Sequence, residues 1–171
     1  VICAADGSQS DVRLIPDGAG GAILTWDDTR DVSYDVYAQR IVADGYVLWG
    51  SGGVAVSTAA NSQRTPRIAS DGARGAIIAW QDSRSGQDDI YAQRVDASGN
   101  MQWTADGVVV CDETNNQMIP VIVSDGTGGA IIAWQDQRAN DMEYDLYAQA
   151  IDGTGTARWA DNGVALCLSL I

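Results

Sequence analysis

The chain has 171 residues, a net charge of −13 and a pI of about 4.1, with 46% hydrophobic and 19% charged residues. This composition excludes a disordered chain, and the length suits one compact domain or a short repeat array. The negative charge argues against nucleic acid and anionic membranes as partners, and no apolar run approaches the roughly 18 residues of a membrane span, so we expect no membrane insertion.

The basic residues restrict the available chemistry. All ten are arginine, and the chain contains no lysine and no histidine. Serine or cysteine triads and Schiff-base catalysis are therefore excluded. Almost all acidic residues are aspartate, which favours turns over helices. We expect strands and loops, and a protein that is not an enzyme.

One unit of 54 to 56 residues occurs three times along the chain. One set of tryptophans recurs at intervals of 54 and 54 residues: Trp26, Trp80 and Trp134. A second set recurs at intervals of 54 and 56 residues: Trp49, Trp103 and Trp159. The two extra residues fall between Arg138 and Tyr144, which marks a surface loop. We expect a single repeat domain over residues 1–171, with units at 4–57, 58–111 and 112–167.

Each unit predicts four strands in the same order. In the second unit they fall within residues 63–72, 75–84, 89–96 and 107–111, each bounded by Gly, Asp, Ser or Asn. The second segment is apolar on both faces, so it should be covered on both sides, whereas the third alternates and should lie nearer the outside. An all-β fold with three four-stranded repeats follows.

The repeated motifs resemble β-propeller repeats of secreted and cell-surface bacterial proteins. Ser70–Arg84 and Ser124–Arg138 carry Ser-Asp-Gly-x-x-Gly-Ala-Ile-Ile-Ala-Trp-Gln-Asp-x-Arg, and Asp89–Gln93 and Asp145–Gln149 carry Asp-(Ile/Leu)-Tyr-Ala-Gln. The first copy departs from this pattern, with Pro16-Asp17 and Asp27-Asp28. The resemblance implies propeller blades and an extracellular or cell-surface location, and it says little about a ligand. The alternative fold is a β-trefoil, which also uses three four-stranded repeats.

Three units are too few for a propeller, which typically closes with four to eight blades. The first residues, Val1–Cys3, align with Val109–Cys111, the end of a unit's last strand. We therefore expect the missing blades to come from neighbouring repeats of a longer chain, or from a homo-oligomer with six blades. Cys3, Cys111 and Cys167 are interpreted mainly as small apolar strand residues, and their disulfide status stays open.

Two repeated sets of side chains are candidates for ligand binding. Arginine forks bind carboxylates or sugar hydroxyls, and exposed tryptophans stack on sugars, but ion pairing within a turn and core packing are the structural alternatives. The candidates are Trp49, Trp103, Trp159, Arg30, Arg84 and Arg138. The expected partner is a carbohydrate or a protein surface.

Calcium is the candidate cofactor, because three loops gather the oxygen ligands that it prefers. Their acidic residues are Asp31, Asp35, Asp88, Asp89, Asp141 and Asp145. None of the loops has an established calcium-loop spacing, so the sequence allows calcium without requiring it.

The predicted function is binding or scaffolding outside the cell. The alternative is a glycoside hydrolase similar to the sialidases, since two carboxyl groups about 5 to 10 Å apart are able to cleave a glycosidic bond. Catalytic residues usually occur in only one unit of a repeat protein, and the three units of this chain are nearly alike. We therefore assign no catalytic residue.

Overall fold

The computed structural model describes residues 1–139 and 143–168. Within these ranges the chain forms twelve strands and no helix, so nothing described is a helix able to cross a membrane. The strands are β1 (Gln9–Pro16), β2 (Ala22–Asp28), β3 (Asp35–Ile41), β4 (Val54–Ser57), β5 (Gln63–Ser70), β6 (Ala76–Asp82), β7 (Asp89–Val95), β8 (Val108–Cys111), β9 (Gln117–Ser124), β10 (Ala130–Asp136), β11 (Asp145–Ile151) and β12 (Val164–Cys167).

The strands form three separate antiparallel sheets, each a meander of four consecutive strands. We call β1–β4 the first sheet, β5–β8 the middle sheet and β9–β12 the third sheet. All three have the same register, with Trp26 opposite Tyr37, Trp80 opposite Tyr91 and Trp134 opposite Tyr147. The prediction of an all-β fold built from three four-stranded repeats is confirmed.

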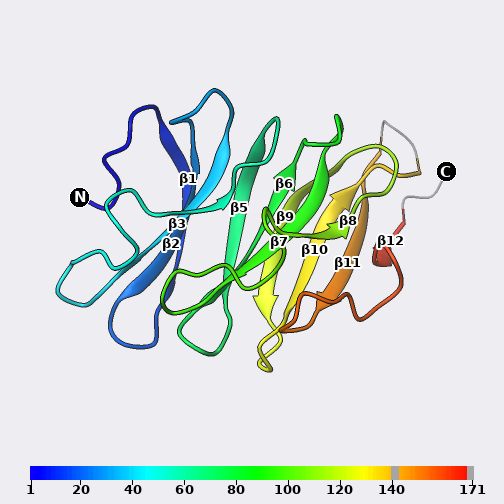
Figure 1. The fold of residues 1–171 in the computed structure, drawn as a ribbon. Helices are drawn as coiled ribbons and strands as arrows, with labels where there is room; N and C mark the ends of the chain where they lie inside the picture. Colours follow the sequence, from blue (N-terminus) through cyan, green and yellow to red (C-terminus); the bar gives the residue numbers. More distant parts are fainter. Residues whose placement is uncertain (140–142, 169–171) are drawn as a thin grey trace.

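The sheets stand side by side in chain order, with the two termini at opposite ends of the row (Figure 1). Their first strands form the inner edge of the array, where β5 contacts both β1 and β9, whereas β4, β8 and β12 are the far strand of each sheet. The array is open, because the first and third sheets each have one face with no neighbouring sheet. The β-trefoil, in which three repeats close into one body, is not what the structure shows.

Every inner strand contains a bulge near its start. The ladder shifts register between Ser10 and Arg13, and at the equivalent places of the other two sheets. The residue at the bulge has a positive φ in each case, 45° at Asp11 and 53° at both Thr65 and Ile119. A bulge bends its strand and turns side chains away from the regular alternation. Positive φ is rare for β-branched residues such as Thr65 and Ile119, so its recurrence in all three strands is a property of the fold and not of the residue type.

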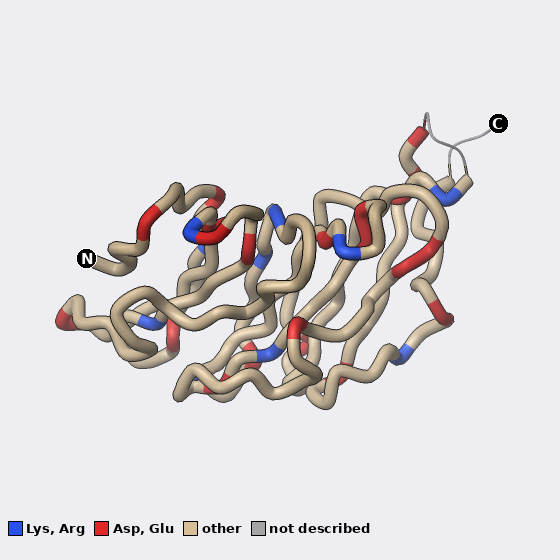
Figure 2. The backbone as a smooth tube through the Cα atoms, turned by 45° about the horizontal axis from the view of Figure 1, so that its top comes forward, with Lys and Arg blue, Asp and Glu red and all other residues tan. Residues whose placement is uncertain are grey.

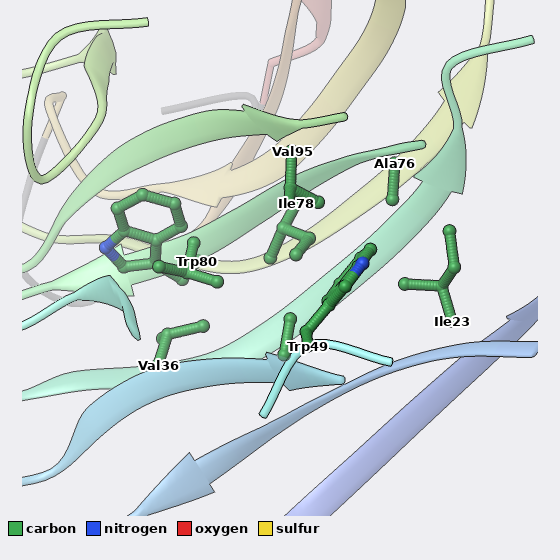
Figure 3. Close-up of a cluster of buried hydrophobic side chains, with 9 residues drawn as sticks. Ile23, Val36, Trp49, Ala76, Ile78, Trp80 and Val95 are labelled. Atoms are coloured by element: carbon green, nitrogen blue, oxygen red, sulfur yellow. The ribbon is translucent and has the colours of Figure 1, made fainter. Parts of the chain in front are cut away.

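Two hydrophobic cores fill the spaces between the sheets. In the first, Ile23, Val36 and Trp49 of the first sheet meet Ala76, Ile78, Trp80 and Val95 of the middle sheet (Figure 3). In the second, Ala79, Ile90, Ala92 and Val110 meet Ile132, Trp134 and Ile151 of the third sheet. Strand β6 therefore supplies both cores, which explains why its sequence is apolar on both faces. Each fully buried large apolar side chain contributes roughly 1.5–3 kcal/mol to folding.

Candidate functional site

The repeated Asp-x-Arg pair follows the second strand of each sheet and forms the same arrangement three times. In the middle sheet, Asp82 accepts hydrogen bonds from the indole N–H of Trp80 (2.8 Å) and from Nε and Nη2 of Arg84 (2.9 and 2.6 Å). Arg84 also donates to the carbonyl of Asp106 (2.7 Å), and its guanidinium carbon lies 3.9 Å from the ring centroid of Tyr91. The equivalents are Asp28, Arg30 and Tyr37 in the first sheet and Asp136, Arg138 and Tyr147 in the third.

These pairs are largely shielded from water. The side chains of Arg30, Arg84 and Arg138 are 20%, 22% and 17% exposed, and their aspartate partners are fully buried. Burial alone would raise the pKa of Asp28, but hydrogen bonds from Arg30 and Trp26 outweigh it and lower that pKa. Bidentate, charge-assisted bonds of this kind fix the turn after the strand. The structure thus places the three candidate arginines in intramolecular ion pairs.

The three candidate tryptophans differ in exposure. Trp49 is 5% exposed and its Nε1 donates to the carbonyl of Ala97 in the middle sheet (3.2 Å). Trp103 is half-buried and donates in the same way to Gly153 of the third sheet (3.2 Å). Among the described residues no sheet follows Trp159, which is 40% exposed. Two of the three therefore lie between sheets, and only Trp159 among them faces solvent.

The carboxyl groups of the candidate calcium loops differ in burial and in hydrogen-bond partners. Asp35 and Asp89 are 2% and 0% exposed. Burial first, and then the charges of Asp31 and Asp28, raise the pKa of Asp35 to about 6, and burial also raises the pKa of Asp89. Asp88 accepts hydrogen bonds from the side chains of Gln81 (2.8 Å) and Ser83 (2.6 Å). The carboxyl groups of Asp88 and Asp89 are therefore engaged within their own loop.

The remaining candidates for calcium add no cluster. Asp145 is 4% exposed, and Asp141 lies outside the described residues. Within residues 1–139 and 143–168, no group of three or more Cys, Asp or Glu side chains is placed to hold a metal ion. We therefore include no metal in the proposed function.

Sequence reasoning left one repeated aspartate without a role. Oδ1 of Asp71 accepts the backbone N–H groups of Ala73 and Gly75 (2.7 and 2.8 Å), which closes the hairpin between β5 and β6. Oδ2 accepts Nε and Nη2 of Arg94 (3.1 and 2.9 Å), and Nη1 of Arg94 donates to the carbonyl of Gly153 in the third sheet (3.1 Å).

The first sheet repeats this arrangement with Asp17, Arg40 and the carbonyl of Ala97, again in the following sheet. In the third sheet Ala150 stands where the arginine would be. The signal in the sequence was the constant spacing of 23 residues between the aspartate and the arginine. A single arginine thus links a hairpin of its own sheet to a loop of the next.

Two aspartates that are not repeated and a pair of repeated arginines gather where β1 and β5 meet. Asp11, at the bulge of β1, pairs with Arg13 (2.5 Å) and with Arg67 of β5 (3.1 Å). Burial, followed by the charge of Asp11, raises the pKa of nearby Asp27 to about 6. The equivalent residues of Asp11 and Asp27 in the other units are Thr65, Ile119, Gln81 and Gln135. The two aspartates are therefore specific to the first unit.

A groove of about 260 Å³ opens beside this charged junction, between the first strands of all three sheets. Its lining residues are Arg13, Leu14, Arg67, Ile68, Val121 and Ile122. The side chains of Arg13 and Arg67 are 42% and 21% exposed, so they present hydrogen-bond donors at the groove. Apolar side chains next to arginines are typical of surfaces that bind other proteins.

The charged residues elsewhere are spread along the length of the molecule and do not gather in one patch (Figure 2). Comparison of the chain with protein-family models and with curated proteins finds no match. The groove of the inner edge is therefore the candidate functional site on geometry alone.

Proposed function

We propose that the chain forms three blades of a β-propeller and acts outside the cell as a non-enzymatic module for binding or scaffolding. The architecture is supported by three alike meanders packed face to face, with their first strands together at an inner edge. The extracellular location rests on the resemblance of the repeats to those of secreted and cell-surface bacterial proteins.

One observation carries the binding role. The arginines of the repeated Asp-x-Arg pairs are largely shielded from water. Arg13 and Arg67 occupy one repeat position, where the third unit has Val121, and although both pair with Asp11 they line a groove shared by all three sheets. The binding role rests on this combination of two partly exposed arginines with apolar walls in one groove.

The groove favours a protein segment over a sugar as the ligand. Its walls combine Leu14, Ile68 and Ile122 with two arginines, a composition typical of protein interfaces. No indole is among its lining residues, although aromatic rings are the usual platform for sugars. Carbohydrate is the second ligand class, because Trp159 is exposed at the end of the array.

A peptide library displayed on phage tests the groove. We expect selection on the wild-type chain to enrich peptides whose affinity falls about tenfold or more for Arg13→Ala, since an interfacial arginine often contributes 1–2 kcal/mol or more. Arg158→Ala is the matched control, because Arg158 is 56% exposed and lies in the third sheet, outside the groove. Its affinity for the same peptides should stay at the wild-type value.

A glycan array completes this test. Peptides that bind wild type and Arg13→Ala equally would show that the groove is not the site. Binding of a glycan instead, lost in Trp159→Ala, would replace the protein ligand with a carbohydrate. If no peptide and no glycan binds, the proposed ligand-binding role is wrong.

A glycosidase is the less well supported alternative. Asp27 and Asp11 form a carboxyl pair that breaks the repeat, and a pKa of about 6 suits a general acid. However, Asp27 is 6% exposed, and its Oδ1 is buried with no hydrogen-bond partner among the described residues. A sugar ring would not reach this group in the observed structure.

A further inference from the structure

We propose that two copies of this chain bind each other end to end, so that the free face of each third sheet packs on the free face of the other copy's first sheet. The inference rests on the propeller architecture of the proposed function, and it names the surfaces that complete the ring. We call the free face of the third sheet the trailing face (Ile131, Leu146, Trp159, Leu166) and that of the first sheet the leading face (Val12, Leu14, Gly45).

The trailing face has the composition of a buried interface. In the middle sheet, the equivalent face packs on the third sheet, and its Ile77, Ile90 and Val110 are 0%, 0% and 2% exposed. The residues at the same repeat positions of the third sheet, Ile131, Leu146 and Leu166, are 36%, 45% and 60% exposed. Large apolar residues that are exposed together on one face of a sheet are typical of an interaction site.

The leading face also exposes apolar residues whose equivalents are buried in the other sheets. Leu14 is 62% exposed, whereas Ile68 and Ile122, at the same position of the other sheets, are packed against the two cores. Val12 is 52% exposed, although its equivalents Pro66 and Pro120 are buried. Both ends of the row therefore present one half of the contact that the chain already makes twice internally.

The tryptophan joint between sheets shows how the two halves fit. Trp49 lies over Gly99 of the middle sheet, where an added Cβ would be 2.8 Å from Cγ of the indole. Trp103 lies over Gly155 of the third sheet in the same way, with a distance of 3.0 Å. Each indole also donates to the carbonyl two residues before that glycine, at Ala97 and Gly153.

The two halves of a third such joint lie at opposite ends of the row of sheets. Trp159 supplies an exposed indole, and Gly45 of the first sheet is the glycine at the matching repeat position, with nothing within 4 Å of an added Cβ. Ala43 supplies the equivalent carbonyl. An indole from a second copy would complete the joint with the glycine and the acceptor that the other two joints use.

For the 171-residue chain, the number of sheets selects a dimer. The described residues form three sheets, and a propeller typically closes with four to eight blades. Six is the one multiple of three in that range, so two copies related by a two-fold axis close the ring through two identical joints. Closure of a head-to-tail contact is what separates a ring from an open filament.

The first residues of the chain occupy a place that the second copy needs. Arg30 donates to the sulfur of Cys3 (3.5 Å), as Arg84 donates to Ser57 (3.4 Å) and Arg138 to Cys111 (3.2 Å), the ends of β4 and β8. In the dimer, Cys167 at the end of the other copy's β12 takes this position. Binding therefore displaces Val1–Cys3, whose Val1 side chain is fully exposed.

Sedimentation equilibrium and light scattering over a concentration series test the inference. We expect the wild-type chain to reach twice its 18.0 kDa mass. Trp159→Ala should raise the dimer dissociation constant at least tenfold, because a tryptophan at an interface centre is a typical hot spot. Gly45→Ala should weaken the dimer as strongly, because its methyl group would meet the partner's indole.

The controls separate the joint from general effects on the fold. Gly86→Ala carries the same positive-φ strain as Gly45→Ala, with φ of 100° and 83°, and Gly86 also has open space around it, but it lies in the middle sheet. Val109→Ala removes a 42% exposed apolar residue of the middle sheet, away from both end faces. Both should dimerise like wild type, and far-ultraviolet circular dichroism verifies that all variants fold.

Three results would overturn the inference: a wild-type monomer at every concentration, a dimer that Trp159→Ala and Gly45→Ala leave unchanged, or assemblies that grow beyond two copies. The ligand test is independent of these masses, because Arg13→Ala should dimerise normally. A monomer that still binds peptides through Arg13 defeats the dimer alone, and a dimer without any ligand defeats the binding role alone.

Discussion

At the scale of single residues, the fold depends on buried aspartates that hold arginines. Asp82 accepts bonds from the indole of Trp80 and from Arg84, whose guanidinium also reaches a backbone carbonyl and the ring of Tyr91. One carboxylate thus connects a core side chain, a turn and a far strand. Removing one partner from such a buried pair is costly, because the other charge is left uncompensated.

We expect Asp82→Asn to lower the free energy of unfolding by about 2–4 kcal/mol, measured by urea denaturation. Asp161→Asn, a change of the same kind at an exposed aspartate, should shift it by less than about 0.5 kcal/mol. Equal shifts for the two variants would show that the Asp82–Arg84 pair has no structural role.

Asp27 gives the protein a stability that depends on pH. Its pKa is raised from 3.8 to about 6, first by burial, so the folded chain keeps a proton that the unfolded chain releases. The stabilisation from this proton is complete below the unfolded pKa and is lost as the pH rises through about 6. Asp28 contributes with the opposite sign, because its pKa is lowered and its stabilisation is lost as the pH falls.

Comparing Asp27→Asn with the wild-type chain isolates the contribution of Asp27. The neutral amide should stabilise the protein at pH 7 by on the order of 1–3 kcal/mol, and the difference should disappear near pH 4. Urea denaturation at both pH values measures it, with Asp161→Asn as the control that shows no such change. A difference that is constant with pH would contradict the raised pKa.

At the scale of elements, the sheets are joined by a loop glycine beneath a tryptophan and by an arginine that reaches the next sheet. Gly99 has a φ of 90° and leaves space for the indole of Trp49. Arg40 binds Asp17 in its own sheet and the carbonyl of Ala97 in the next. These contacts fix how one sheet packs on another, beyond what the apolar cores determine.

Gly99→Ala tests this joint. The added methyl group would lie 2.8 Å from Trp49, so we expect a loss of about 2–4 kcal/mol in unfolding free energy from overpacking and positive φ together. Gly86→Ala carries only the strain of positive φ, about 1 kcal/mol, because its surroundings are open. If both variants lose the same free energy, the contact with Trp49 is not required.

At the scale of the whole molecule, three alike sheets leave two unlike ends. The trailing face exposes Leu146 and Leu166, and the leading face exposes Leu14. The apolar cores and the tryptophan joints between sheets are alike along the row, so the end faces expose residues whose equivalents are buried between sheets. This property connects the architecture to the proposed dimer.

Local patterns predicted most of the elements. The alternation in 89–96 and the apolar run in 76–80 correspond to β7 and β6, and the spacing of the tryptophans corresponds to the common register of the three sheets. Strand formation depends on neighbouring residues and on turn residues such as Gly and Asp, which are visible in one sequence. The expectation that the strand within 89–96 lies nearer the outside was wrong: β7 has no exposed residue, because it lies between β6 and β8 in a sheet that is covered on both faces. Local patterns did not identify the candidate binding residues, because the exposure of these residues depends on packing between sheets.

The sequence by itself determined the strand content, the repeat and the excluded chemistry, because each follows from residue types and short spacings. Only the tertiary structure decided that Trp49 lies between sheets while Trp159 faces solvent, since the two differ solely in whether a sheet follows. It also brought Asp11 of β1 to Arg67 of β5, 56 residues later. Such contacts depend on how whole sheets pack, and a pattern within a few neighbouring residues carries no information on contacts between residues so far apart in the sequence.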